Sequence, residues 1–172
     1  HIVYFDADND DLKYACRAER AWSIEIVDGE GDVGRYACLD VDRFGYVHIS
    51  YYDATNGYLR YAHRTGAGWQ LQTADWRGDS GLFTCLVADS DGEPHITYCD
   101  RFNLTLRYAQ GCGMRWYLQT IDATPGAGMY TTLALDAEDH PYIGYYVDAA
   151  HSLRYAHWDG HTWYVDAIDQ GE

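Results

Sequence analysis

Apolar and aromatic residues fall in short groups along the chain, separated by segments rich in Gly, Asn, Asp and Ser. No group has helical periodicity, and short groups of aromatic and β-branched residues between turn residues predict strands. Apolar side chains occupy both parities of one such group, at Ile49, Tyr51 and Tyr52. A strand that is apolar on both faces is buried on both, as in a sheet packed between two others. Around the middle of the chain, the pattern predicts strands at 48–53, 58–63, 69–75 and 82–89.

The same pattern returns every 47 residues without a gap. A segment Leu-Lys/Arg-Tyr-Ala begins at Leu12, Leu59, Leu106 and Leu153, and a tryptophan follows each time at Trp22, Trp69, Trp116 and Trp163. A period of 40 to 50 residues with four strands is typical of β-propeller blades. The sequence therefore predicts four repeats, at 1–47, 48–94, 95–141 and 142–172.

We expect an all-β fold, a β-propeller-type array of four-stranded antiparallel blades in a single domain over residues 1–172. The turn at 89–94 resembles the link from an inner strand to a second strand, which places inner strands at about 36–42, 83–89 and 130–136. One blade then lacks its inner strand. We expect that strand from residues beyond Glu172 or from another copy of the chain, because exposed strand edges invite pairing.

Charge narrows the range of partners. The chain carries 12 Lys and Arg against 27 Asp and Glu, a formal net charge of −15. This charge repels phosphate backbones and anionic membranes, so we expect neither nucleic-acid partners nor membrane insertion. No segment approaches the length of a transmembrane helix, and the acidic residues are spread through the turns. An extracellular or cell-surface location suits this composition.

The five cysteines include one pair that the turn at Asp91 and Gly92 places almost opposite each other, Cys85 and Cys99. Residues opposite each other on paired strands are close enough for a disulfide with some strain. The sequence leaves open whether Cys85 and Cys99 form a disulfide or remain two free thiols. The sequence suggests no partner for Cys16, Cys38 or Cys112.

The acidic turns suggest calcium as the one candidate cofactor. Calcium takes six to eight oxygen ligands, and the acidic turns richest in carboxylates contain Asp6, Asp8, Asp10, Asp40 and Asp42. No turn matches a complete EF-hand loop, so ordinary Asp-rich turns are the favoured interpretation.

Aromatic side chains are the candidate ligand contacts. Tyrosines and tryptophans that recur in every repeat are better explained as packing between blades. The repeated histidines His1, His48 and His95 have no close metal-ligand spacing and are read as structural. Aromatic residues that do not recur are better candidates for stacking on sugars, namely Tyr58, Trp76, Phe102, Tyr117 and Trp158.

The pattern H-I-x-Y-Y-D, then L-[KR]-Y-A, then G-x-x-W resembles tandem propeller repeats of secreted bacterial and archaeal surface proteins, loosely related to sialidase-like, Asp-box propellers. The segment Trp158 to Trp163 looks like a degenerate Asp-box. The resemblance implies the fold. The Arg-Ile-Pro start of sialidases is absent, and Arg60, Arg107 and Arg154 share one repeat position, which argues against a catalytic arginine set.

The leading functional hypothesis is a non-enzymatic extracellular scaffold or adhesion protein, self-assembling through its open blade edges. A glycan-binding lectin with sites between blades is the alternative, and a glycosidase-like enzyme fragment is less favoured. A lectin predicts equivalent pockets at a spacing of 47 residues, an enzyme predicts one pocket unlike the others, and a scaffold predicts large contacts between chains.

Overall fold

The computed structural model describes residues 1–171, which form four antiparallel sheets. The first sheet has three strands, β1 (Ile2–Asp6), β2 (Asp11–Ala18) and β3 (Ala21–Asp28). The second sheet contains β4 (Val33–Val41), β5 (Val47–Asp53), β6 (Tyr58–Thr65) and β7 (Gly68–Asp75). The third contains β8 (Ser80–Ala88), β9 (Pro94–Asp100), β10 (Thr105–Cys112) and β11 (Arg115–Asp122). The fourth contains β12 (Ala127–Leu135), β13 (Pro141–Val147), β14 (Ser152–Trp158) and β15 (Trp163–Gln170).

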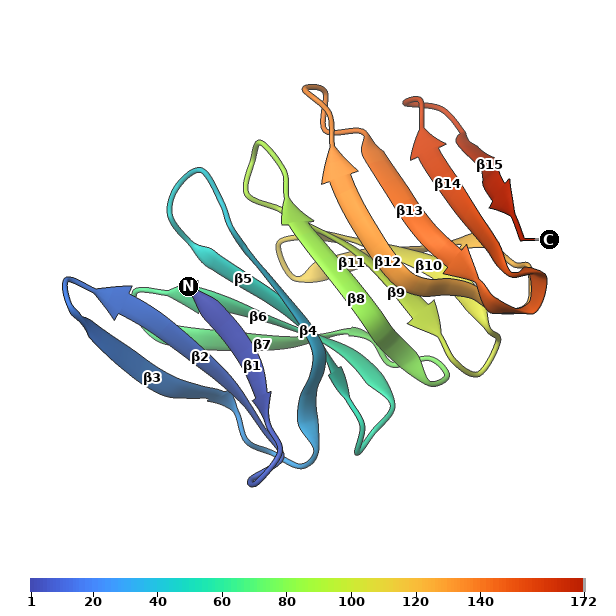
Figure 1. The fold of residues 1–172 in the computed structure, drawn as a ribbon. Helices are drawn as coiled ribbons and strands as arrows, with labels where there is room; N and C mark the ends of the chain where they lie inside the picture. Colours follow the sequence, from blue (N-terminus) through green and yellow to red (C-terminus); the bar gives the residue numbers. More distant parts are fainter. Residues whose placement is uncertain (172) are drawn as a thin grey trace.

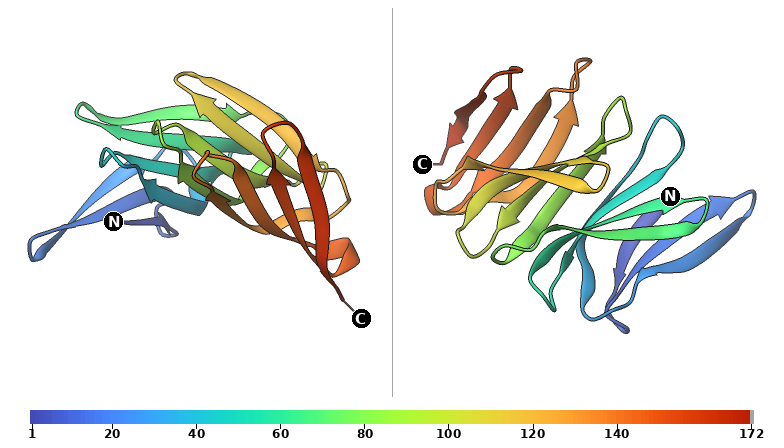
Figure 2. Two further views of the ribbon diagram at one scale, coloured as in Figure 1. Left: turned by 90° about the horizontal axis from the view of Figure 1, so that it is seen from above. Right: turned by 180° about the vertical axis from the view of Figure 1, so that it is seen from behind.

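The four sheets follow one another along an open arc (Figure 1). Within each sheet, the strands lie in chain order and pair with their sequence neighbours. The first strands of the second, third and fourth sheets, β4, β8 and β12, are neighbours across the sheet boundaries. The first and fourth sheets lie at opposite ends of the molecule in all three views (Figures 1 and 2). The predicted strand ranges and the predicted blade without an inner strand, which is the first sheet, agree with this arrangement.

A glycine in each of β4, β8 and β12 lets the sheets approach closely. Gly34 has a φ of 105°, and a Cβ atom there would lie 2.8 Å from the Cα of Leu12 on the neighbouring sheet. Gly81 and Gly128 meet Leu59 and Leu106 in the same way. The three leucines are fully buried, and each belongs to a core cluster between two sheets. The hydrophobic core is therefore divided into layers between neighbouring sheets.

The Cys85–Cys99 disulfide is wrong for this structure, in which both thiols are free. The turn pairs Ala88 with Pro94, so Cys85 lies opposite Thr97. One register shift between Leu82 and Cys85 then places Leu82 opposite Cys99. Cys85 and Cys99 are symmetric about Gly92, whereas the strand pairing is symmetric about Asp91, so Thr97 and not Cys99 faces Cys85.

The only helical element of residues 1–171 is the short 3₁₀ turn η1 (Asp148–Ala150). Within the same residues, no helix has the length and hydropathy to cross a membrane.

Candidate functional site

Two cavities occupy equivalent positions between neighbouring sheets. Pocket A, between the second and third sheets, has a volume of about 260 Å³ and is lined by residues that include His48, Tyr61, His63, Gln72, Glu93 and Met114. Pocket B, between the third and fourth sheets, has a volume of about 280 Å³ and is lined by residues that include His95, Tyr108, Gln110, Gln119, Asp139, His140, Trp158 and Trp163. A step of 47 residues carries His48 to His95, Tyr61 to Tyr108 and Gln72 to Gln119.

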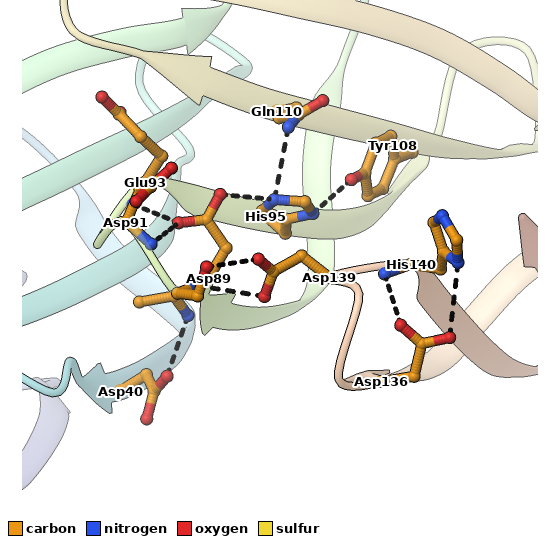
Figure 3. Close-up of polar contacts among 12 residues, drawn as sticks. Asp40, Asp89, Asp91, Glu93, His95, Tyr108, Gln110, Asp136, Asp139 and His140 are labelled. Atoms are coloured by element: carbon orange, nitrogen blue, oxygen red, sulfur yellow. Dashed lines mark hydrogen bonds and ion pairs between the residues drawn. The ribbon is translucent and has the colours of Figure 1, made fainter. Parts of the chain in front are cut away.

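His95 is held in one orientation on the wall of pocket B (Figure 3). Its Nε2 lies 3.2 Å from Oδ2 of Asp89, and its Nδ1 hydrogen-bonds the hydroxyl of Tyr108. A carboxylate can only accept, so Nε2 carries the proton and Nδ1 accepts from Tyr108. Burial lowers the pKa of His95, against the opposing effect of Asp89. The ring is therefore neutral near pH 7.

A tryptophan from the fourth sheet forms the opposite wall of pocket B. The ring of Trp163 meets the ring of Tyr108 edge to face, with centroids 5.3 Å apart. Its Nε1 donates to Oε1 of Gln119 at 2.7 Å. The glutamine is thereby fixed with its amide group beside the aromatic pair, where it can offer hydrogen bonds to a ligand.

Pocket A repeats this frame one sheet earlier. His48 lies 3.2 Å from Asp42 and 2.6 Å from the hydroxyl of Tyr61. The Tyr61 and Trp116 rings are 5.2 Å apart, and Nε1 of Trp116 donates to Gln72 at 3.0 Å. The two pockets thus share a lining histidine, tyrosine and glutamine in matched contacts. Trp163 lines pocket B, whereas its counterpart Trp116 contacts Tyr61 and Gln72 from outside pocket A.

The rims of the two pockets differ. In pocket A, Glu93 accepts a backbone hydrogen bond from Gly113 at 3.1 Å, and His63 stacks on His48 with centroids 4.7 Å apart. In pocket B, the rim carries Asp139, which accepts from Ser90 at 2.6 Å, and His140 (Figure 3). Each rim thus carries a carboxylate in a chain of net charge −15, so the electrostatic field at both pockets is unfavourable for anions.

One repeat position holds a different residue in each of the three spaces between neighbouring sheets. Trp158 lines pocket B, and the equivalent residue at pocket A is Gly111. Between the first and second sheets, the equivalent residue is Arg64, whose guanidinium lies over the rings of Tyr14 and Trp69 at 5.3 and 5.6 Å. Arg64 also pairs with Glu25 at 2.6 Å. This third position is therefore occupied by an arginine side chain.

Of the five aromatic residues predicted to contact a ligand, Trp158 lies in pocket B. Trp76 lies beside a separate shallow hollow with Arg77 and Trp116. Phe102 and Tyr117 are exposed to 79% and 56%, and Tyr58 begins β6. The structure does not gather these five residues into one site. The lining histidines and tyrosines that recur in the repeats are interpreted from the sequence as structural because they recur. The sequence pattern does not single out Gln72 and Gln119.

The carboxylates suggested for calcium have protein partners. Asp6 pairs with Lys13, which lowers the pKa of Asp6 to about 2. Asp42 accepts two backbone N–H groups and contacts His48, and Asp40 accepts from the backbone of Ala88 at 2.9 Å. No group of three or more His, Cys, Asp or Glu side chains in residues 1–171 is arranged to hold a metal. Calcium at these positions or at Asp8 and Asp10 stays a prediction.

Two solved structures resemble this chain. A fucose lectin from Kordia zhangzhouensis, solved in complex with methyl-fucoside, superposes with a TM-score of 0.54 at 21% identity, over 78% of this chain and 99% of that one. A protein of unknown function from Dyadobacter fermentans superposes with a TM-score of 0.67 at 10% identity, over 94% of this chain and 59% of that one. No family model and no curated protein matches the sequence. The likeness is one of fold.

Proposed function

We propose that the chain is a non-enzymatic carbohydrate-binding protein with one site in pocket A and one in pocket B, and that its four sheets are blades of a β-propeller. The observation that carries this proposal is that a histidine, a tyrosine and a glutamine line both pockets at a spacing of 47 residues. Binding proteins built from repeats present equivalent sites, whereas a glycosidase-like enzyme predicts one pocket unlike the others. The resemblance to a fucose lectin supports the same function.

The pocket walls suit a small neutral sugar. Each pocket combines an aromatic surface, which packs against the C–H groups of a sugar ring, with a fixed glutamine and a histidine–tyrosine pair for its hydroxyl groups. The volumes of about 260 and 280 Å³ are close to the lower end of ligand pockets, roughly 300 Å³, so a single sugar ring is the expected occupant. The acidic rims and the net charge of −15 disfavour acidic sugars.

Isothermal titration with methyl-fucoside, followed by a glycan array, tests this function. We expect two bound sugars per chain. The double variant Trp158→Arg with Gln119→Glu copies the Arg64–Glu25 pair into pocket B and should reduce the stoichiometry to one. Phe102→Arg places an arginine on an exposed turn outside both pockets and should leave two sites. Absence of any sugar ligand on the array, or an unchanged stoichiometry in the double variant, would overturn the proposal.

An extracellular or cell-surface location is part of this proposal, because it suits both the acidic composition and a glycan ligand. The scaffold function is not exclusive of sugar binding.

A further inference from the structure

The same polar contact joins every pair of neighbouring sheets. A tyrosine hydroxyl on one sheet donates to an aspartate on the preceding sheet, in the pairs Tyr51–Asp28 at 2.6 Å, Tyr98–Asp75 at 2.8 Å and Tyr145–Asp122 at 2.7 Å. The same repeat positions are occupied by Tyr4 on the first sheet and Asp169 on the fourth. Within residues 1–171, neither side chain has a hydrogen-bond partner of this kind, because no sheet lies beyond it.

The aromatic contact between sheets also leaves one ring without its partner on the first sheet and one on the fourth. Tyrosine and tryptophan rings meet edge to face in the pairs Tyr14–Trp69, Tyr61–Trp116 and Tyr108–Trp163, with centroids 5.2 to 5.3 Å apart. The next members of this series are Tyr155 on the fourth sheet and Trp22 on the first. Trp22 is 50% exposed.

Charged side chains at the two ends also lack the partners that their counterparts have. The residue on the first sheet is basic, and the residue on the fourth sheet is acidic. The ion pair between Glu25 and Arg64 links the first and second sheets at 2.6 Å. Equivalent repeat positions hold Asp166 on the fourth sheet and Arg17 on the first, both exposed and without an ion-pair partner in the described part of the chain. Lys13 likewise corresponds to Arg60, which pairs with Asp28 at 3.5 Å, the counterpart of Asp169.

We propose that the first sheet of one copy docks on the outer face of the fourth sheet of a second copy, head to tail. Trp22 then packs on Tyr155, Arg17 pairs with Asp166, and Tyr4 and Lys13 meet Asp169. The occupant is a second copy because the two sheets that carry these faces lie at opposite ends of one molecule (Figure 2). The matched charges make this contact favourable despite the net charge of −15.

One part of the internal contact is absent at this junction. Leu12, Leu59 and Leu106 are fully buried beneath β4, β8 and β12, whereas Leu153 is 45% exposed. The first sheet has no corresponding strand to cover Leu153. The junction therefore depends more on its ion pairs than the internal ones do, and it should weaken with salt. A head-to-tail contact closes into a ring or continues as a filament.

Sedimentation velocity over a concentration series tests the proposal on the 172-residue chain, with circular dichroism to confirm that each variant folds. We expect the average mass to rise with protein concentration and to fall with added salt. Arg17→Asp and Asp166→Arg should each weaken association at least tenfold, and the double variant should restore it. Arg115→Asp makes the same charge change at an exposed residue on the outer strand β11 and should leave association unchanged.

Four results would overturn the proposal. The first is a monomer at every concentration. The second is a loss in Arg17→Asp that the Arg115→Asp control matches. The third is a double variant that stays dissociated, which would show that the two residues do not meet. A change in the shape of the monomer that is independent of concentration would also overturn it, since the ends would then meet within one chain. None of these results depends on sugar binding.

Discussion

Arg64 extends from the second sheet to the first, where its Nη1 lies 2.6 Å from Oε1 of Glu25. Its guanidinium also covers the ring of Tyr14 at 5.3 Å. At the equivalent points of pockets A and B, the chain has Gly111 and Trp158, with Gln72 and Gln119 in place of the glutamate. Two substituted positions therefore separate an arginine-filled space from an open pocket.

If this difference controls binding, Arg64→Gly together with Glu25→Gln should open a third sugar site. The change reproduces the residues of pocket A beside the Tyr14–Trp69 pair, and Nε1 of Trp69, which is buried without a partner, would gain the glutamine as acceptor. Glycine within β6 costs about 1 kcal/mol of stability, which the fold should tolerate. Isothermal titration should give three sugars per chain instead of two. A stoichiometry that remains at two would contradict the assignment of Arg64 as the residue that fills this position.

The repeat made the fold predictable, because the residue pattern of each strand recurs several times in the sequence. Leu59 and Leu106 have the same neighbours one sheet apart, so a spacing of 47 residues was enough to order the strands and to find the three-stranded first sheet. The side-chain pattern within one repeat is ambiguous by itself, whereas agreement among several repeats is not.

The pockets could not be predicted in this way. Tyr108 and Trp163 recur in every repeat and do pack between sheets, as expected, yet they also line a cavity. Whether space remains beside them depends on the reach of one side chain, Arg64 or Trp158, across a sheet boundary. The register error at Cys85 has another origin, since the turn residues alone do not show whether the hairpin is centred on Asp91 or on Gly92, and the pairing of Ala88 with Pro94 centres it on Asp91.

The hydrogen bonds between sheets predict a measurable difference between two tyrosines at one repeat position. Tyr98 is fully buried, and its hydroxyl donates to Asp75, which is also buried. Tyr98→Phe removes this donor and leaves a carboxylate oxygen less satisfied, at a cost of about 1–3 kcal/mol in the free energy of unfolding. Tyr4→Phe, the matched control, should cost about 0.5 kcal/mol or less where the protein is monomeric. Urea denaturation of both variants measures the difference, and equal losses would contradict it.

Cysteine reactivity should follow burial. Cys112 is exposed at the end of β10, whereas Cys99 is buried and its thiol lies 3.6 Å from the carbonyl of Ala127. Burial raises the pKa of Cys99 to about 11, so very little thiolate is present at neutral pH. Iodoacetamide should therefore modify Cys112 before Cys99, as followed by peptide mass spectrometry. A Cys85–Cys99 disulfide in the non-reduced protein would contradict the strand register.

Acid should destabilise the protein through its buried histidines. Burial lowers the pKa of His95 and of His63 below the value of 6.5 that an exposed histidine has. The unfolded chain therefore takes up protons at a higher pH than the folded protein, and stability is lost as the pH falls below about 6.5.

His95→Gln keeps a donor for Asp89 and an acceptor for Tyr108 but does not titrate. Urea denaturation at pH 7.5 and 5.5 should show a smaller loss for this variant than for the unsubstituted protein. An equal loss in the two proteins would mean that His95 is not a source of the acid sensitivity, and that carboxylates such as Asp42, whose pKa is lowered in the folded state by backbone hydrogen bonds and by His48 against the opposing effect of burial, account for it instead.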